Sequence, residues 1–155
     1  MVRVGVALAA LAALAAFLWV LMRVTLTPIP GAADDTTGNT RPGESLRFYL
    51  NRPSVKDAVI QVGGNLALMM PFGVILPLVS RRFRGLLRVG LVVALFSLSV
   101  EVVQGFMIVG RSFDADDVIL NTAGAMLAYL LIGRKVSGWV HSGRSSARAG
   151  ARASG

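Results

Sequence analysis

Residues 86–107 read LLRVGLVVALFSLSVEVVQGFM, and this stretch decides the fold. At 1.5 Å per helical residue it is long enough to cross the roughly 30 Å hydrocarbon core of a bilayer. It carries one acid, Glu101, and a carboxylate beside lipid is costly enough to mark a functional position by default. The stretch therefore predicts a membrane-spanning helix and names a first candidate site residue.

Three further apolar runs predict spans at about 4–22, 58–79 and 117–132. The first exceeds the roughly 7–15 apolar residues of a signal peptide and lacks a small-residue cleavage site, so we expect a retained anchor. The second contains Pro71, which we expect to kink it. The fourth covers only about 24 Å if helical, so it needs local bilayer thinning or support from its neighbours. We expect an all-α membrane protein with four transmembrane helices.

The composition narrows the classes of chemistry. The chain is 54% hydrophobic with a mean hydropathy of +0.65, and it has no Cys and one His. That residue, His141, follows the last apolar run, which argues against a Ser-His-Asp arrangement and against histidine-ligated zinc. The net charge of +8 comes from basic segments that flank the spans, and orientation in a bilayer explains them better than nucleic-acid binding does. We expect no nucleic-acid partner, no cofactor and no metal.

The charges also predict the orientation of the chain. Arg3, the turn at 81–88 and the tail from Arg134 onward carry ten basic residues, against six on the other side. The positive-inside rule then places both termini in the cytoplasm. All eight acidic residues fall on or just inside the outer side, which includes the loops 27–57 and 108–116.

The sequence divides into a membrane domain and a tail. Residues 1–141 form the expected membrane domain, and residues 142–155 form a low-complexity basic segment. Such a composition cannot bury enough apolar surface to fold, so we expect a disordered tail.

Polar residues on three predicted spans fall at similar depth near the outer leaflet. Glu101 lies roughly 9 Å, Asn65 roughly 10 Å and Asn121 roughly 6 Å from the outer end of its helix. Unrelated polar residues would not be expected to agree in this way, so we infer a polar pocket that opens outward. Its predicted lining is Asn65, Glu101, Gln104, Arg111, Asp117 and Asn121.

A structural explanation stays open for part of this set. Amide hydrogen bonds between membrane helices contribute only about 0.6 kcal/mol each, and Gln61, Asn65 and Asn121 fit that role as well as a binding role. Glu101 is different, because a buried carboxylate needs a partner or a proton. Arg111 is the expected partner, in a structural pair or in one that binds substrate or handles protons.

The segment Asp114-Ala115-Asp116-Asp117 has the look of a divalent-cation loop. It lacks the glycine and the distal glutamate of a calcium-binding EF-hand loop. We favour a helix N-terminus with acids on the positive end of the dipole, capped by Ser112 or Asp114.

Two blocks resemble those of the VanZ-like family over about residues 44–133. Residues 65–73 read NLALMMPFG and are followed by Leu76-Pro77, similar to the family's Asn…Pro-Phe-Gly…Leu-Pro block. Residues 101–104 read EVVQ, similar to the Glu-x-x-Gln that opens its second block. That block continues here with Arg111, Asp114, Asp117, Asn121, Gly124 and Ala125. The family's loop element Asn-x-x-Pro-Phe corresponds only loosely to Leu46–Leu50.

The resemblance implies a small multi-span protein of the bacterial plasma membrane. The name-giving member is associated with resistance to the glycopeptide antibiotic teicoplanin. We expect binding or modulation of an envelope lipid, a cell-wall lipid intermediate or a lipophilic glycopeptide, with Arg111 contacting a phosphate or carboxylate. The expected binding residues are Asn65, Glu101, Gln104, Arg111, Asp114, Asp117 and Asn121.

Two other functions remain open. One is a membrane enzyme on a lipid-linked cell-wall substrate, with Glu101 or Asp117 as general base. The less favoured one is a proton-coupled transporter, which would need an oligomer because four spans are few.

Overall fold

The computed structural model describes residues 2–28, 38–51 and 54–142. Within these ranges the chain forms helices and one isolated β-bridge, between Asn39 and Asp114. Four helical stretches are long and apolar enough to cross a bilayer. They are Gly5–Thr25, Val59–Val79, Leu86–Met107 and Ala115–Val140. The all-helical, four-span prediction is confirmed, while the predicted tail lies outside the described residues from position 143 onward.

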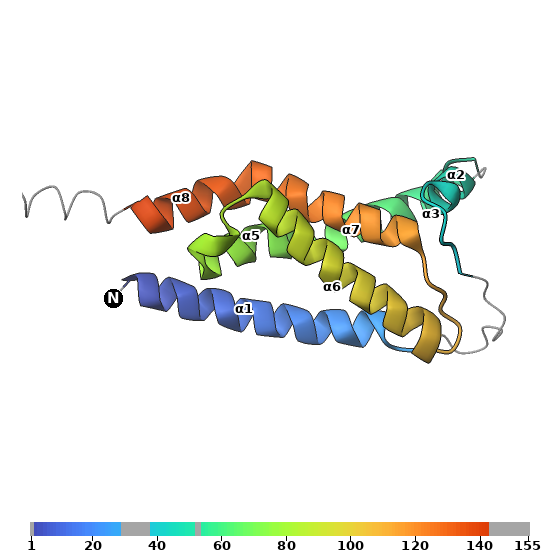
Figure 1. The fold of residues 1–155 in the computed structure, drawn as a ribbon, viewed down its shortest axis with the longest axis horizontal. Coiled ribbons are helices and arrows are strands. Elements are labelled where there is room, and N and C mark those ends of the chain that lie inside the picture. Colours follow the sequence, from blue (N-terminus) through green and yellow to red (C-terminus); the bar gives the residue numbers. More distant parts are fainter. Residues whose placement is uncertain (1, 29–37, 52–53, 143–155) are drawn as a thin grey trace, which may run out of the picture.

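The helices form an elongated bundle (Figure 1). The elements are α1 Val2–Thr25, α2 Glu44–Leu50, α3 Val55–Ala58, the π-helical η1 Val59–Gly63, α4 Gly64–Leu68, α5 Met70–Val79, the 3-10 helix η2 Arg81–Phe83, α6 Leu86–Met107, α7 Ala115–Ala128, the π-helical η3 Tyr129–Gly133 and α8 Arg134–Ser142. In Figure 1, α1 and the α7–α8 rod form opposite flanks, and α5 and α6 lie between them. The start of α1 and the end of α8 lie at one end of the bundle, and α2 and α3 lie at the other.

The second span breaks where proline predicts a kink. Met69 has φ −102° and ψ 1°, which separates α4 from α5 two residues before Pro71. Proline has no N–H to donate and its ring clashes with the carbonyl four residues earlier, so the helix restarts at this point. The restart is closed by a hydrogen bond from the Phe72 N–H to the Met69 carbonyl, at 3.1 Å.

The fourth span is longer than predicted. The sequence predicts an end near residue 132, but α7 continues through η3 into α8, so the candidate span has 26 residues. A helix of that length covers about 39 Å, and the expected bilayer thinning is not needed. Arg134 and Lys135 do not end the helix, because their long side chains can reach the aqueous interface from within it.

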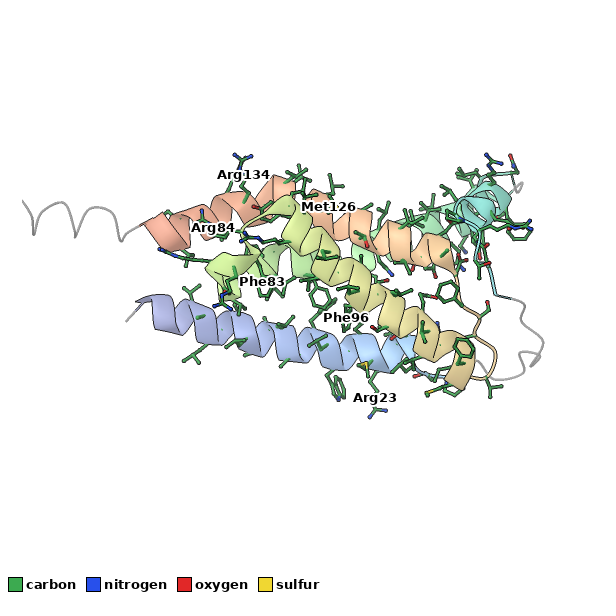
Figure 2. The ribbon with its side chains drawn as sticks, in the orientation of Figure 1. Arg23, Phe83, Arg84, Phe96, Met126 and Arg134 are labelled. Atoms are coloured by element: carbon green, nitrogen blue, oxygen red, sulfur yellow. The ribbon has the colours of Figure 1, made fainter. Side chains whose placement is uncertain are left out.

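Small residues allow α7 and η3 to lie close against α4 and α5. A Cβ added to Gly124 would overlap the Leu66 carbonyl, and one added to Gly133 would overlap the Gly73 carbonyl. Gly124 therefore lets the two helix backbones approach each other closely. On the α1 side the core is aromatic, with Phe72 packed between Phe17 and Phe96 at ring-centroid distances of 5.4 and 5.1 Å. In Figure 2, Phe96 points into the interior between α6 and α1.

Candidate functional site

The N-terminus of α7 organises the polar end of the bundle. Asp114 caps the helix, because its Oδ1 accepts a hydrogen bond from the Asp116 N–H at 2.9 Å. The predicted helix cap at Asp114 is confirmed. Among the described residues, no group of three or more His, Cys, Asp or Glu side chains is arranged to hold a metal ion.

Asp116 fixes the short helix α2 to α7. Its carboxylate accepts hydrogen bonds from the Gly43 N–H at 2.5 Å and the Leu46 N–H at 3.0 Å. These donors belong to the first turn of α2, where N–H groups lack partners within the helix and a negative charge is favourable. The Asp116 side chain is only 4% exposed, so this cap lies between the two helices.

Asp114 and Asn39 hold the loop that leads into α2. The Asp114 Oδ2 accepts a hydrogen bond from the Ser45 hydroxyl at 2.5 Å, and its Oδ1 accepts one from the Asn39 amide at 3.2 Å. The Asn39 backbone bonds on both sides of Asp114, donating to the Phe113 carbonyl at 2.7 Å and accepting from the Ala115 N–H at 2.9 Å. None of the seven side chains of α2 is buried. The contacts described for α2 are therefore mainly polar, with a smaller apolar contribution from the half-buried Leu46 and Tyr49.

A small cavity lined by polar and apolar side chains lies beneath α2, between α4 and α7. It measures about 190 Å³ including its opening. Its polar lining is Ser45, Tyr49, Gln61, Asn65, Asp116 and Asp117. Asn65 donates a hydrogen bond to Asp117 across it, which joins α4 to α7. The space left inside holds about one water molecule, so a ligand group can enter only if α2 moves.

Glu101 reaches the same helix N-terminus from α6. Its Oε2 accepts a hydrogen bond from the Asp114 N–H at 3.0 Å, and its side chain is buried. Its carboxylate is also within electrostatic range of Asp114, of Asp117 and of the Arg111 guanidinium. Three carboxylates from two helices thus gather at the start of α7, where they repel one another and favour a hydrogen-bond donor or a cation.

The contacts of Gln104 and Arg111 point to α1. Gln104 donates to the Thr25 carbonyl at 2.8 Å, and Arg111 donates to the carbonyls of Val24 at 2.9 Å and Thr27 at 3.3 Å. The last carbonyls of a helix have no partner within it, so these side chains cap the C-terminal end of α1. The predicted Glu101–Arg111 pair stays a prediction, and the structure gives this guanidinium a role in holding α1.

One turn deeper, a hydrogen bond between side chains joins α6 to α7, and one oxygen of the amide involved has no partner among the described residues. Asn121 donates to the Ser97 hydroxyl at 2.9 Å, and both side chains are buried. The Asn121 Oδ1 has no hydrogen-bond partner among the described residues. A buried acceptor without a partner carries an energetic cost, so this position is not fully explained as contact between helices.

The structure brings together six of the seven predicted residues and adds others. The six are Asn65, Glu101, Arg111, Asp114, Asp117 and Asn121, and of the six predicted pocket residues Asn65 and Asp117 line the cavity. Sequence reasoning missed Asp116, Asn39 and Ser45. For Asp116, the available signal was its place among three acids at positions 114–117, at the start of a predicted helix.

Comparison with protein families decides the assignment. The VanZ/LLP1 family model matches residues 12–135, which includes both resemblance blocks and most of the first span. The chain belongs to the VanZ-like family. The match to VanZ-like proteins contains every predicted site residue and also Asp116, Asn39 and Ser45. Comparisons with curated proteins and with solved structures gave no match.

Proposed function

We propose that this VanZ-like membrane protein binds the polar part of an envelope lipid or a lipophilic glycopeptide at the α2 end, in the space between α2, α4 and α7. The observation that carries the proposal is the docking of α2. A short helix without a fully buried side chain is held over a small cavity by the carboxylates of Asp114 and Asp116. A cover held by polar contacts can be displaced by a ligand that replaces them.

The lining favours a ligand with hydrogen-bond donors. Asp117, Asn65 and Gln61 present carboxylate and amide oxygens, and Ser45 and Tyr49 add hydroxyl groups. This set suits the hydroxyl, amide and amine groups of a glycopeptide or a sugar–peptide headgroup better than it suits a phosphate. The expected phosphate contact through Arg111 is not part of the proposal, since that guanidinium caps α1.

The geometry of α2 supports a site at the membrane surface. Phe48 and Leu50 are exposed on α2, and Arg47 is exposed beside them. Aromatic side chains with a basic neighbour suit the interfacial layer of a bilayer. A ligand with an acyl chain could then keep its chain in lipid while its polar part approaches Asp117.

The test compares two carboxylate-to-amide changes at the same end of the molecule. Asp117→Asn alters the cavity, and Glu44→Gln alters an exposed carboxylate on α2. We expect Asp117→Asn in nanodiscs to bind teicoplanin or a lipid-linked cell-wall intermediate at least about tenfold more weakly, because a hydrogen bond to a charged group contributes about 1.5–3 kcal/mol. Glu44→Gln should bind like the parent. If folded Asp117→Asn protein binds both probes normally, the proposed site is wrong.

A membrane enzyme is the second candidate. Asp117 lines the cavity and lies within electrostatic range of Glu101, and paired carboxylates in unlike surroundings can divide acid and base roles. Turnover of a lipid-linked cell-wall substrate by purified protein, lost in Asp117→Asn, would favour this candidate over simple binding.

A further inference from the structure

The end of the bundle opposite α2 carries basic side chains from two segments distant in sequence. The turn between α5 and α6 supplies Arg81, Arg82 and Arg84, the first turn of α6 supplies Arg88, and α8 supplies Arg134 and Lys135. All six side chains are exposed. The sequence contains no acidic residue between positions 58 and 100 or after position 117. The spans therefore place no carboxylate beside the positive charges at this end of the bundle.

Backbone packing brings the two basic segments together. Gly133 sits against the Gly73 carbonyl and beside Pro77, and Ser137 is fully buried, so α8 lies along α5 up to the turn. Figure 2 shows Arg84 in this turn and Arg134 on α8 at the same end of the bundle. The Arg84 guanidinium reaches α8, where its Nη2 would lie 3.7 Å from a Cβ on Gly138.

The turn itself is folded tightly. The Ser80 hydroxyl accepts a hydrogen bond from the Arg82 N–H at 3.3 Å, and Arg88 donates to the Arg82 carbonyl at 3.0 Å. The arginines of the turn are thus presented from a compact frame rather than from a long loop. Like charges held close together repel, and a bound anion relieves that repulsion.

Exposed apolar side chains lie beside these charges. Leu87, next to Arg88, is 81% exposed, and Trp139, next to Gly138, is 79% exposed. Tryptophan at this position suits the headgroup level of a membrane, and Leu91 continues the exposed face of α6 one turn deeper. The surroundings therefore fit an anion that also carries an acyl chain.

We propose that η2 and α8 together bind the headgroup of an anionic phospholipid. The phosphate lies between Arg84 of the turn and Arg134 of α8, and an acyl chain follows Leu87 and Leu91 along α6. Basic clusters between membrane helices are a known form of lipid-headgroup site. This site is separate from the cavity beneath α2 and does not depend on the function proposed for that cavity.

The test uses protein in phosphatidylcholine nanodiscs that contain a minor fraction of phosphatidylglycerol. Native mass spectrometry would count the lipids that stay bound after release. The test variant is R84Q/R134Q. The matched control is R23Q/R47Q, which removes two exposed arginines, one from α1 and one from α2. Figure 2 shows Arg23 pointing away from the bundle. Size-exclusion profiles and circular dichroism would check that each variant is folded.

We expect the parent protein to retain phosphatidylglycerol in preference to phosphatidylcholine. R84Q/R134Q should lower that preference by about 30-fold, because each arginine near an anionic surface accounts for about fivefold in affinity. R84K/R134K should keep most of the preference, since it keeps the charges. The proposal is overturned if the parent shows no preference, if R23Q/R47Q lowers it as much as R84Q/R134Q does, or if the lysine variant loses as much as the glutamine variant.

Discussion

The docking of α2 can be tested through the carboxylate that holds it. Asp116→Ala removes the acceptor of two backbone N–H groups, those of Gly43 and Leu46. Hydrogen bonds to a charged group contribute about 1.5–3 kcal/mol each, but both share one carboxylate and the freed N–H groups can reach water. The loss of a helix N-cap costs about 0.5–2 kcal/mol. We therefore expect α2 docking to weaken by about 2 kcal/mol.

Amide hydrogen exchange over residues 43–50 measures this directly. A loss of about 2 kcal/mol corresponds to about 30-fold faster exchange if local opening limits it. Asp116→Asn should give an intermediate acceleration, because the amide keeps one oxygen acceptor and loses the charge. Glu44→Gln, which removes an exposed charge from the first turn of the same helix, should accelerate exchange by no more than about fivefold, since such a charge contributes about 0.3–1 kcal/mol. Unaltered exchange over 43–50 in folded Asp116→Ala would refute the view that this carboxylate fixes α2.

Three further changes test the packing of the bundle. Gly124→Ala should destabilise the protein by about 1–3 kcal/mol, because the added Cβ overlaps the α4 backbone. Gly64→Ala is the control, because a Cβ there meets open space. Thermal melts in detergent would compare the two variants. Asn121→Leu should cost more stability than the double change Asn121→Leu with Ser97→Ala, since the single change leaves a buried hydroxyl unpaired; chemical denaturation would reveal the difference. Arg111→Gln should free the end of α1 and raise the labelling rate of a cysteine placed there, and an unchanged rate would contradict the capping role.

The four spans could be predicted because each is a run of apolar residues long enough to cross a bilayer. Residues 86–107 match α6 at both ends, and the break before Pro71 follows from proline chemistry. The end of the fourth span was not predictable from charge, because Arg134 and Lys135 interrupt the apolar run without interrupting the helix. Whether a helix continues past such residues depends on the neighbour it packs against, and here Gly133 and Ser137 face α5.

The candidate site was predictable only where helical spacing defines it. Glu101 and Asn121 were placed by depth along their helices, and both lie at the start of α7 or one turn below it. Asp116 was not predicted as a site residue because its partners belong to the first turn of α2, about 70 residues earlier, and no periodicity links the two. The Glu101–Arg111 pair stays a prediction, and no pattern in the sequence indicates that this guanidinium also binds the unpaired carbonyls at the end of α1.

The position of Asp116 next to Asp117 couples the cover to the cavity. If the ligand of the proposed site binds only when α2 is displaced, it must first overcome the docking free energy, and its apparent affinity is lowered by the fraction of molecules that are open. Asp116→Ala would then raise affinity, by up to about 30-fold for the 2 kcal/mol estimated above. If instead α2 closes over the ligand and contributes Ser45 and Tyr49 as contacts, the same change would lower affinity. Binding of one probe to Asp116→Ala and to the parent therefore distinguishes a cover that excludes the ligand from one that holds it. If Asp116→Ala accelerates hydrogen exchange over α2 but leaves the affinity for the probe unchanged, α2 plays no part in binding.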